Sequence, residues 1–155
     1  MASITITGLT ELKTKLSRAK NLKTLVHAVN MASAVLEQKT KPKIPVDTGA
    51  LRGGLTIIPA NIQGDEIIGG VRNNMEYAIY VEYGVGRKAV GTHPKAEGFT
   101  YRMTPWVYPK ETSDGLKFIK TNGFAAKAPM YLGLKEAKLN IKQIISQAIL
   151  ESIRG

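Results

Sequence analysis

Residues that could carry catalysis or bind a metal are few in this 155-residue sequence, which contains two histidines, His27 and His93, and no cysteine. The lack of cysteine excludes disulfide scaffolds, thiol catalysis and thiolate zinc sites. The carboxylates Asp47, Glu76 and Glu82 would need a tertiary arrangement that the sequence does not reveal to act as a general acid and base. We therefore expect no enzymatic activity, no cofactor and no metal site.

The first segment with a distinctive pattern is residues 44–52, which reads as a turn between a helix and a strand. Pro45 stiffens the exit from the preceding helix. Asp47 and Thr48 can bond to nearby backbone amides, and Gly49 tolerates a positive φ angle. A structural turn and an assembly contact are equally good interpretations of this segment.

The second segment is residues 77–84, in which Glu82 is flanked by aromatic and aliphatic side chains. A carboxylate in such surroundings normally needs a cation or hydrogen-bond donors. Arg52 is the candidate partner, either within one chain or across an interface, while Leu51 anchors the turn that carries it. The other residues of this candidate structural or assembly motif are Tyr77, Tyr80, Tyr83 and Gly84, together with Pro129 further along the chain.

Charge is the strongest feature of the composition, because 22 Lys and Arg against 12 Asp and Glu give a formal net charge of +10. Residues 53–84 are acidic overall and lie between basic flanks, an arrangement that could let identical copies attract each other. An insertion over residues 85–104 has no sustained periodicity and is therefore expected to be functional or mobile. Its candidate polyanion contacts are Arg87, Lys88, Lys95 and Arg102.

Apolar side chains recur at helical spacing over about residues 8–41 and again over about 129–153. Pro42 ends the first region because proline lacks an amide donor, and Pro129 suits the first turn of the terminal helix. No segment is long and apolar enough to cross a bilayer, so a membrane partner is not expected.

Strand-forming residues dominate about residues 53–84 and 105–127, on either side of the basic insertion. Within them, the patterns predict one hairpin that turns at residues 63–66, a strand over residues 77–83 with a short helix as the alternative, and a second hairpin over residues 106–119. We expect a single α+β domain over residues 1–155, with an antiparallel sheet and a long hairpin packed against an N-terminal and a C-terminal helix.

Three short motifs, in this order, resemble the tail-completion or head–tail joining proteins of long-tailed bacteriophages, a family of minor capsid or tail components. The family pattern Pro-Val-Asp-Thr-Gly-x-Leu-Arg stands at Pro45–Arg52, and Tyr-Ala-x-Tyr-Val-Glu-Tyr/Phe-Gly stands at Tyr77–Gly84. A variant of the third motif, which precedes the last helix, stands at Ala128–Leu132.

This resemblance implies a non-enzymatic α+β subunit that forms a homo-oligomeric ring, commonly sixfold, at the head–tail junction of the virion. Its partners would be the tail tube protein and the head connector or stopper protein. DNA would pass through the ring or contact it weakly, and assembly would occur in the cytoplasm of the host bacterium. The alternative from the residues alone is a small basic nucleic-acid-binding module, because basic and aromatic side chains alternate after residue 85.

Overall fold

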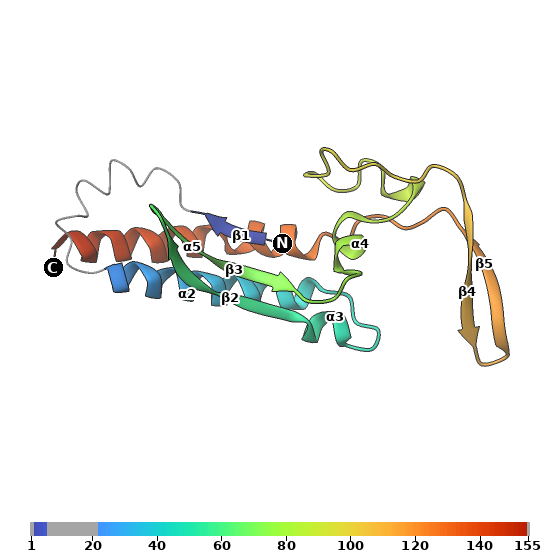
Figure 1. Cartoon of the computed structure of the whole chain (residues 1–155), viewed down its shortest axis with the longest axis horizontal. Coiled ribbons are helices and arrows are strands. Elements are labelled where there is room, and N and C mark those ends of the chain that lie inside the picture. The colour runs from blue at the N-terminus through green and yellow to red at the C-terminus, as the bar shows by residue number, and fades with distance from the viewer. Residues whose placement is uncertain (1, 6–21, 155) are drawn as a thin grey trace. The chain divides into compact units, whose positions relative to one another are not determined.

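The computed structural model describes residues 2–5 and 22–154, and these residues form two compact units. The first unit contains residues 1–75 and 129–155, and the second contains residues 76–128. Helices and antiparallel strands are both present, which confirms the predicted α+β class (Figure 1). The prediction of a single domain over residues 1–155 stays a prediction.

The first unit contains a three-stranded antiparallel sheet in the order β1-β3-β2. Its strands are β1 (Ala2–Thr5), β2 (Leu55–Gln63) and β3 (Glu66–Asn73). β2 and β3 form the predicted first hairpin, which turns at Gly64 and Asp65. A register shift interrupts their pairing between Ile58 and Asn61, around Pro59, since proline cannot donate to the ladder.

Two long helices complete the first unit, α2 (Leu22–Thr40) and α5 (Pro129–Arg154), which run side by side in opposite directions (Figure 1). The buried residues of α2 recur every three or four positions from Leu25 to Leu36, as the predicted periodicity requires. The part of the predicted helical region before residue 22 lies outside the described residues. α2 ends at Thr40, and the short 3₁₀ helix η1 (Lys41–Lys43) then carries Pro42 in its first turn.

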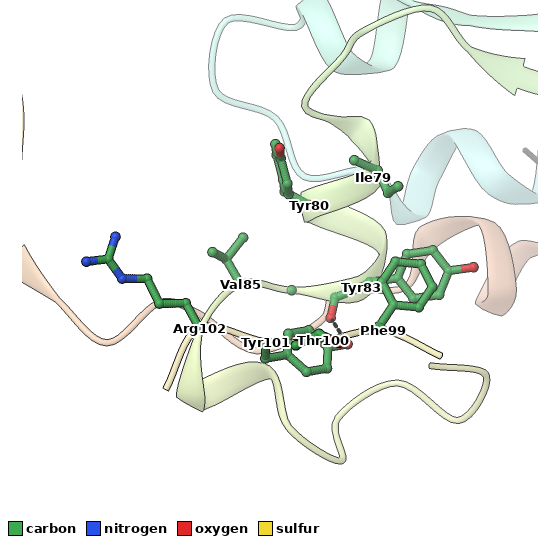
Figure 2. A pocket seen from close by; sticks show the side chains of 10 residues that line it. Ile79, Tyr80, Tyr83, Val85, Phe99, Thr100, Tyr101 and Arg102 are labelled. Carbon is green, nitrogen blue, oxygen red and sulfur yellow. Dashed lines mark hydrogen bonds between the residues drawn. The ribbon is translucent and has the colours of Figure 1, made fainter. Parts of the chain in front are cut away.

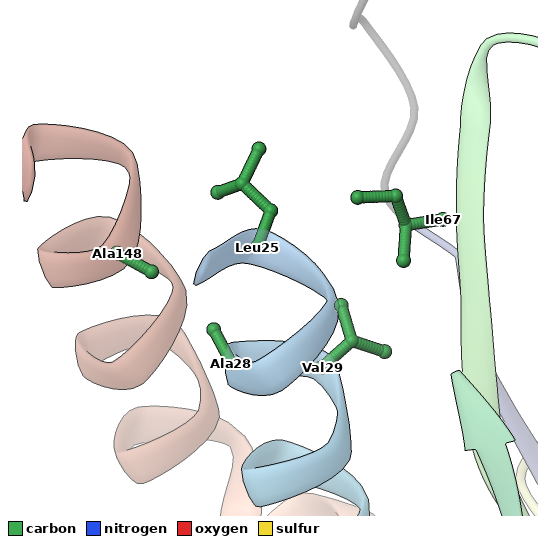
Figure 3. Packing of buried hydrophobic residues seen from close by; sticks show 5 residues of the cluster. All are labelled: Leu25, Ala28, Val29, Ile67 and Ala148. Carbon is green, nitrogen blue, oxygen red and sulfur yellow. The ribbon is translucent and has the colours of Figure 1, made fainter. Parts of the chain in front are cut away.

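The hydrophobic core of the first unit forms where α2 meets both α5 and the sheet. Figure 3 shows Leu25, Ala28 and Val29 of α2 between Ala148 of α5 and Ile67 of β3. Asn30 of α2 also accepts a hydrogen bond of 2.8 Å from the amide of Ala60, beside the register shift in β2. Packing and this polar contact together hold α2 against the sheet.

The second unit contains the short helix α4 (Ala78–Tyr83), the 3₁₀ helix η2 (Arg87–Ala89), and the strands β4 (Trp106–Thr112) and β5 (Gly115–Thr121). β4 and β5 form the predicted second hairpin, with Ser113 and Asp114 at its turn, and Gly115, which begins β5, adopts a φ of 102°. They form a separate two-stranded sheet, so the hairpin does not extend the sheet of the first unit.

For residues 77–83 the preferred strand is wrong and the alternative, a short helix, is correct, because this segment forms α4. Aromatic and β-branched residues favour a strand locally, but tertiary contacts override this preference. The amides of Lys127 and Ala128 donate to the carbonyls of Val81 and Glu82, at 3.0 and 3.2 Å. These bonds satisfy carbonyl groups that the end of a helix leaves without partners in the helix itself.

Candidate assembly surfaces

The turn over residues 44–52 contains a glycine in the left-handed region, as the sequence predicted for Gly49. Gly49 adopts a φ of 86° and precedes the short helix α3 (Ala50–Gly53). The side-chain oxygen of Thr48 accepts a weak bond of 3.4 Å from the amide of Ala50, and Leu51 is buried. Residues 45–48 remain exposed, including Asp47. The segment is therefore a structural turn whose outer side is available for a contact.

Arg52 and Glu82, the predicted pair, lie in different units, and the structure gives each of them another partner within its own unit. The Arg52 Nη2 donates to the carbonyl oxygen of Ile44 at 3.1 Å, which closes the turn. The Oε1 of Glu82 lies 3.2 Å from the Nε2 of His93. Pairing of Arg52 with Glu82 of another copy stays a prediction.

The Glu82–His93 pair links α4 to the basic insertion, and both residues are buried. The amide of Lys95 donates to the Nδ1 of His93 at 3.0 Å, so this nitrogen must be the acceptor. The ring proton then sits on Nε2, which donates to the Glu82 carboxylate. The sequence did not lead us to predict His93 as the partner of Glu82. A histidine eleven residues after a carboxylate that needs a donor could have indicated it.

Aromatic rings pack against the Glu82–His93 pair. The Tyr83 ring stacks on Phe99 with centroids 4.0 Å apart and lies 4.4 Å from the ring of His93. The hydroxyl of Tyr101 donates to the Tyr83 carbonyl at 3.0 Å. Burial raises the pKa of Tyr83, and the nearby Glu82 carboxylate raises it further. The insertion is thus anchored on α4 by ring contacts and hydrogen bonds.

A cavity of about 140 Å³ opens beside these rings, and we call it the aromatic pocket (Figure 2). Its walls come from α4 and from two parts of the chain that follow it. The lining is mainly apolar and aromatic, and Arg102 is its charged member. The side chains that line the pocket are Ile79, Tyr80, Tyr83, Val85, Phe99, Thr100, Tyr101 and Arg102, with the backbone of Gly84 and Gly86.

Gly84, the last residue of the second motif, has a conformation and surroundings that require glycine. Its φ is 77°, and a Cβ atom there would lie 2.7 Å from the Ala126 nitrogen and 2.8 Å from the Phe124 oxygen. Another residue would therefore push the strand-like segment after the hairpin away from α4. The motif positions Tyr77 and Tyr80 remain exposed, so the motif both builds the pocket and presents side chains to solvent.

The second hairpin carries an apolar face, which we define as Val107, Pro109, Leu116 and Phe118. The register pairs Pro109 with Phe118 and Glu111 with Leu116, and alternation along each strand brings these residues to one side. Val107, Leu116 and Phe118 are 57%, 60% and 72% exposed. The apolar face is therefore uncovered in the single chain.

The four predicted polyanion contacts, Arg87, Lys88, Lys95 and Arg102, all lie in the second unit and are exposed. The guanidinium of Arg102 lies 5.4 Å from the ring centroid of Trp106. Such a cation–π contact positions the charge and leaves room for a further acceptor. Pro129 lies elsewhere, in the first unit, where it begins α5.

The described residues contain neither a cluster of metal-ligating side chains nor a helix that could span a membrane. No group of three or more histidine, aspartate or glutamate side chains there could hold a metal ion. Every helix in the same part of the chain is too short or too polar to span a bilayer.

Comparison with known proteins yields one match, to the HK97-gp10-like family, described as "Bacteriophage HK97-gp10, putative tail-component". The match covers residues 9–84 and so includes the turn motif, the first hairpin and the α4 motif, but not the second hairpin or α5. No curated protein and no solved structure matches the chain. Over residues 9–84, the chain is therefore similar to the HK97-gp10-like family of bacteriophage tail components, which confirms the resemblance predicted from its motifs.

Proposed function

We propose that this protein is a structural subunit that forms a ring at the head–tail junction of a long-tailed phage. The ring completes or terminates the tail tube and joins it to the head connector. The observation that carries the proposal is the family match over residues 9–84, combined with an exposed apolar face on the hairpin. Large exposed apolar surfaces mark interfaces with other proteins.

A ring requires two different complementary surfaces on each subunit, because every copy contacts its neighbours head to tail. The chain offers several unlike surfaces for this purpose: the exposed outer side of residues 45–48, the aromatic pocket and the apolar face. The further partners in this proposal are the tail tube protein and the head connector protein, with genome DNA passing through the ring.

We infer that the protein has no catalytic role. The Glu82–His93 pair is the arrangement most like an acid–base site, but each of its groups has a structural task. His93 accepts from the Lys95 amide, and Glu82 accepts from His93. Their bonds hold the basic insertion against α4.

Deletion of the gene from the phage tests the proposal. We expect DNA-filled heads and separate tails, with tails of irregular length if the ring stops tube growth, as counted by negative-stain microscopy. Purified wild-type particles should contain the protein at the junction, as detected by mass spectrometry and antibody labelling. Joined particles of normal length in the deletion strain would contradict the proposal.

A nucleic-acid-binding module is the second candidate, because four basic side chains of the insertion are exposed in one unit. Neutralising phosphate contacts makes DNA affinity fall steeply with salt. Binding measurements at two salt concentrations, with Arg87, Lys88 and Lys95 replaced by glutamine, separate the candidates. Tight binding by a monomer at physiological salt, lost in the triple variant, would favour this function over the ring.

A further inference from the structure

The apolar face of the second hairpin leaves several large side chains exposed to solvent. A two-stranded sheet alone is only marginally stable in water. β4 and β5 pair only with each other, and Phe118 in the middle of β5 is 72% exposed. A stable hairpin therefore requires something that covers this face when the protein works.

The aromatic pocket offers chemistry that matches the apolar face. Its walls include Tyr80, Tyr83 and Phe99, and aromatic rings in edge or offset contact contribute beyond their buried area. A side chain with a ring and no polar group, such as Phe118, fills a site of this kind without leaving a donor or acceptor unpaired.

One charge of the hairpin face can pair with a charge at the pocket. Glu111 and Lys120 both share the face with Phe118, because they pair with Leu116 and Val107 in the register, and Glu111 lies toward the turn while Lys120 lies at the other end. Arg102 is the charged residue that lines the pocket, and it is exposed. A carboxylate brought to the pocket beside the Phe118 ring would meet a guanidinium, which forms strong hydrogen bonds with carboxylates.

We propose that the hairpin of one copy of this chain inserts Phe118 into the aromatic pocket of a second copy, with Glu111 of the first facing Arg102 of the second. The inference deepens the proposed function, since it rests on a ring and names the contact between its subunits. The two surfaces are unlike, so the contact is head to tail and can be repeated until a ring closes.

The face of the hairpin, and not the edge of β4, makes this contact. Pro109 lies within β4 and lacks an amide donor, so it weakens any further strand pairing at that edge. A contact made through the apolar face does not need the amide that Pro109 lacks. Such a contact also gives a reason for the large apolar side chains on the hairpin, which are exposed to solvent in the single chain.

Replacement of Phe118 by serine tests the contact against a matched control. Leu139 on α5 is also 72% exposed but belongs to neither surface. We expect Phe118→Ser to weaken self-association at least about tenfold, in the range of interface hot spots, and Leu139→Ser to leave it unchanged. Sedimentation and native mass spectrometry measure the association. Equal association of the two variants would overturn the inference.

A charge exchange checks the orientation. Glu111→Arg and Arg102→Glu should each weaken association, and their combination in one chain should restore most of it, because every contact then has the reversed pair. Failure of the double variant to recover, with both single variants folded by circular dichroism, would overturn the proposed pairing.

Cysteines introduced at the two surfaces can trap even a weak contact as a disulfide cross-link, and the natural sequence contains no cysteine that would compete. A mixture of Phe118→Cys and Tyr80→Cys proteins should form a mixed disulfide, in concentrated protein and in assembled particles, and a mixture of Phe118→Cys with Leu139→Cys should not. A missing cross-link in both preparations overturns the inference.

The failures of the two proposals can be told apart. If the protein is absent from particles, the head–tail proposal fails, while the cross-link in concentrated protein still decides the contact. If Phe118→Ser still forms rings but no longer joins the tail tube, the hairpin binds a different protein. That result would overturn the inference and leave the head–tail proposal standing.

Discussion

The two units of this chain differ in the interactions that stabilise them. Among the residues whose burial the structure describes, every buried aliphatic residue larger than alanine lies in the first unit: Leu25, Val29, Leu36, Ile44, Leu51, Leu55, Ile67, Val71 and Ile141. The second unit, which is described throughout, buries Ala89 and Ala128 and the polar pair Glu82 and His93. The first unit has an apolar core, and the second has none of comparable size.

This difference indicates a division of labour. Burial of aliphatic side chains stabilises the first unit in the single chain. The second unit relies on ring stacking, a buried hydrogen-bonded pair and one short hairpin, and it keeps large apolar side chains exposed. We infer that the second unit reaches its full stability only against a partner.

The largest expected effect is in the core of the first unit. Leu36 is fully buried on α2, so Leu36→Ala should lower the free energy of unfolding by about 2–5 kcal/mol. The exposed Leu139 is the matched control, and Leu139→Ala should change it by less than about 0.5 kcal/mol. Urea unfolding measures both. Equal effects would mean that α5 turns a different face to the core.

A smaller effect is expected in the second unit when its buried pair is broken. His93→Ala removes the bonds to Glu82 and to the Lys95 amide and should cost about 1.5–3 kcal/mol locally. Amide exchange over residues 85–104 should become about tenfold faster or more, and exchange in α2 should not change. Lys95→Ala keeps the backbone amide and is the control. Faster exchange in both units would refute their energetic separation.

Replacement of Arg52 tests the energetic separation of the two units from within the first unit. Arg52→Ala removes the bond to the Ile44 carbonyl and should destabilise the first unit by about 0.5–1.5 kcal/mol. If Arg52 and Glu82 have separate partners, the costs of Arg52→Ala and Glu82→Ala should add within about 0.5 kcal/mol in the monomer. A larger coupling in the assembled protein alone would place this pair across an interface.

The smallest expected effect concerns the ion pairs that join α5 to the end of α2 and to η1 in the first unit. Lys43 and Lys39 lie 2.8 and 3.1 Å from the Glu136 carboxylate and lower its pKa below the ordinary 4.5. This contribution is present at neutral pH and is lost as the pH falls through the lowered pKa. The Tm of Glu136→Gln should therefore fall slightly below the wild-type value at pH 7 and match it at pH 2.

Local patterns were enough to predict much of the fold. The apolar spacing on α2 and α5, the proline at the start of α5, and the polar turns of both hairpins involve residues close together in sequence. Each pattern therefore specifies its element with little help from the rest of the chain. The turn around Gly49 was predictable for the same reason.

Features that depend on residues far apart in the sequence could not be predicted from local patterns and are determined by the tertiary structure. The segment after Tyr77 became a helix because backbone groups near residue 128 bond to it, and Glu82 found His93 in an insertion without periodicity. The aromatic pocket likewise joins α4 to residues 99–102. Such contacts bring together side chains whose separation along the chain carries no periodic signal, so only their packing in three dimensions selects the partner.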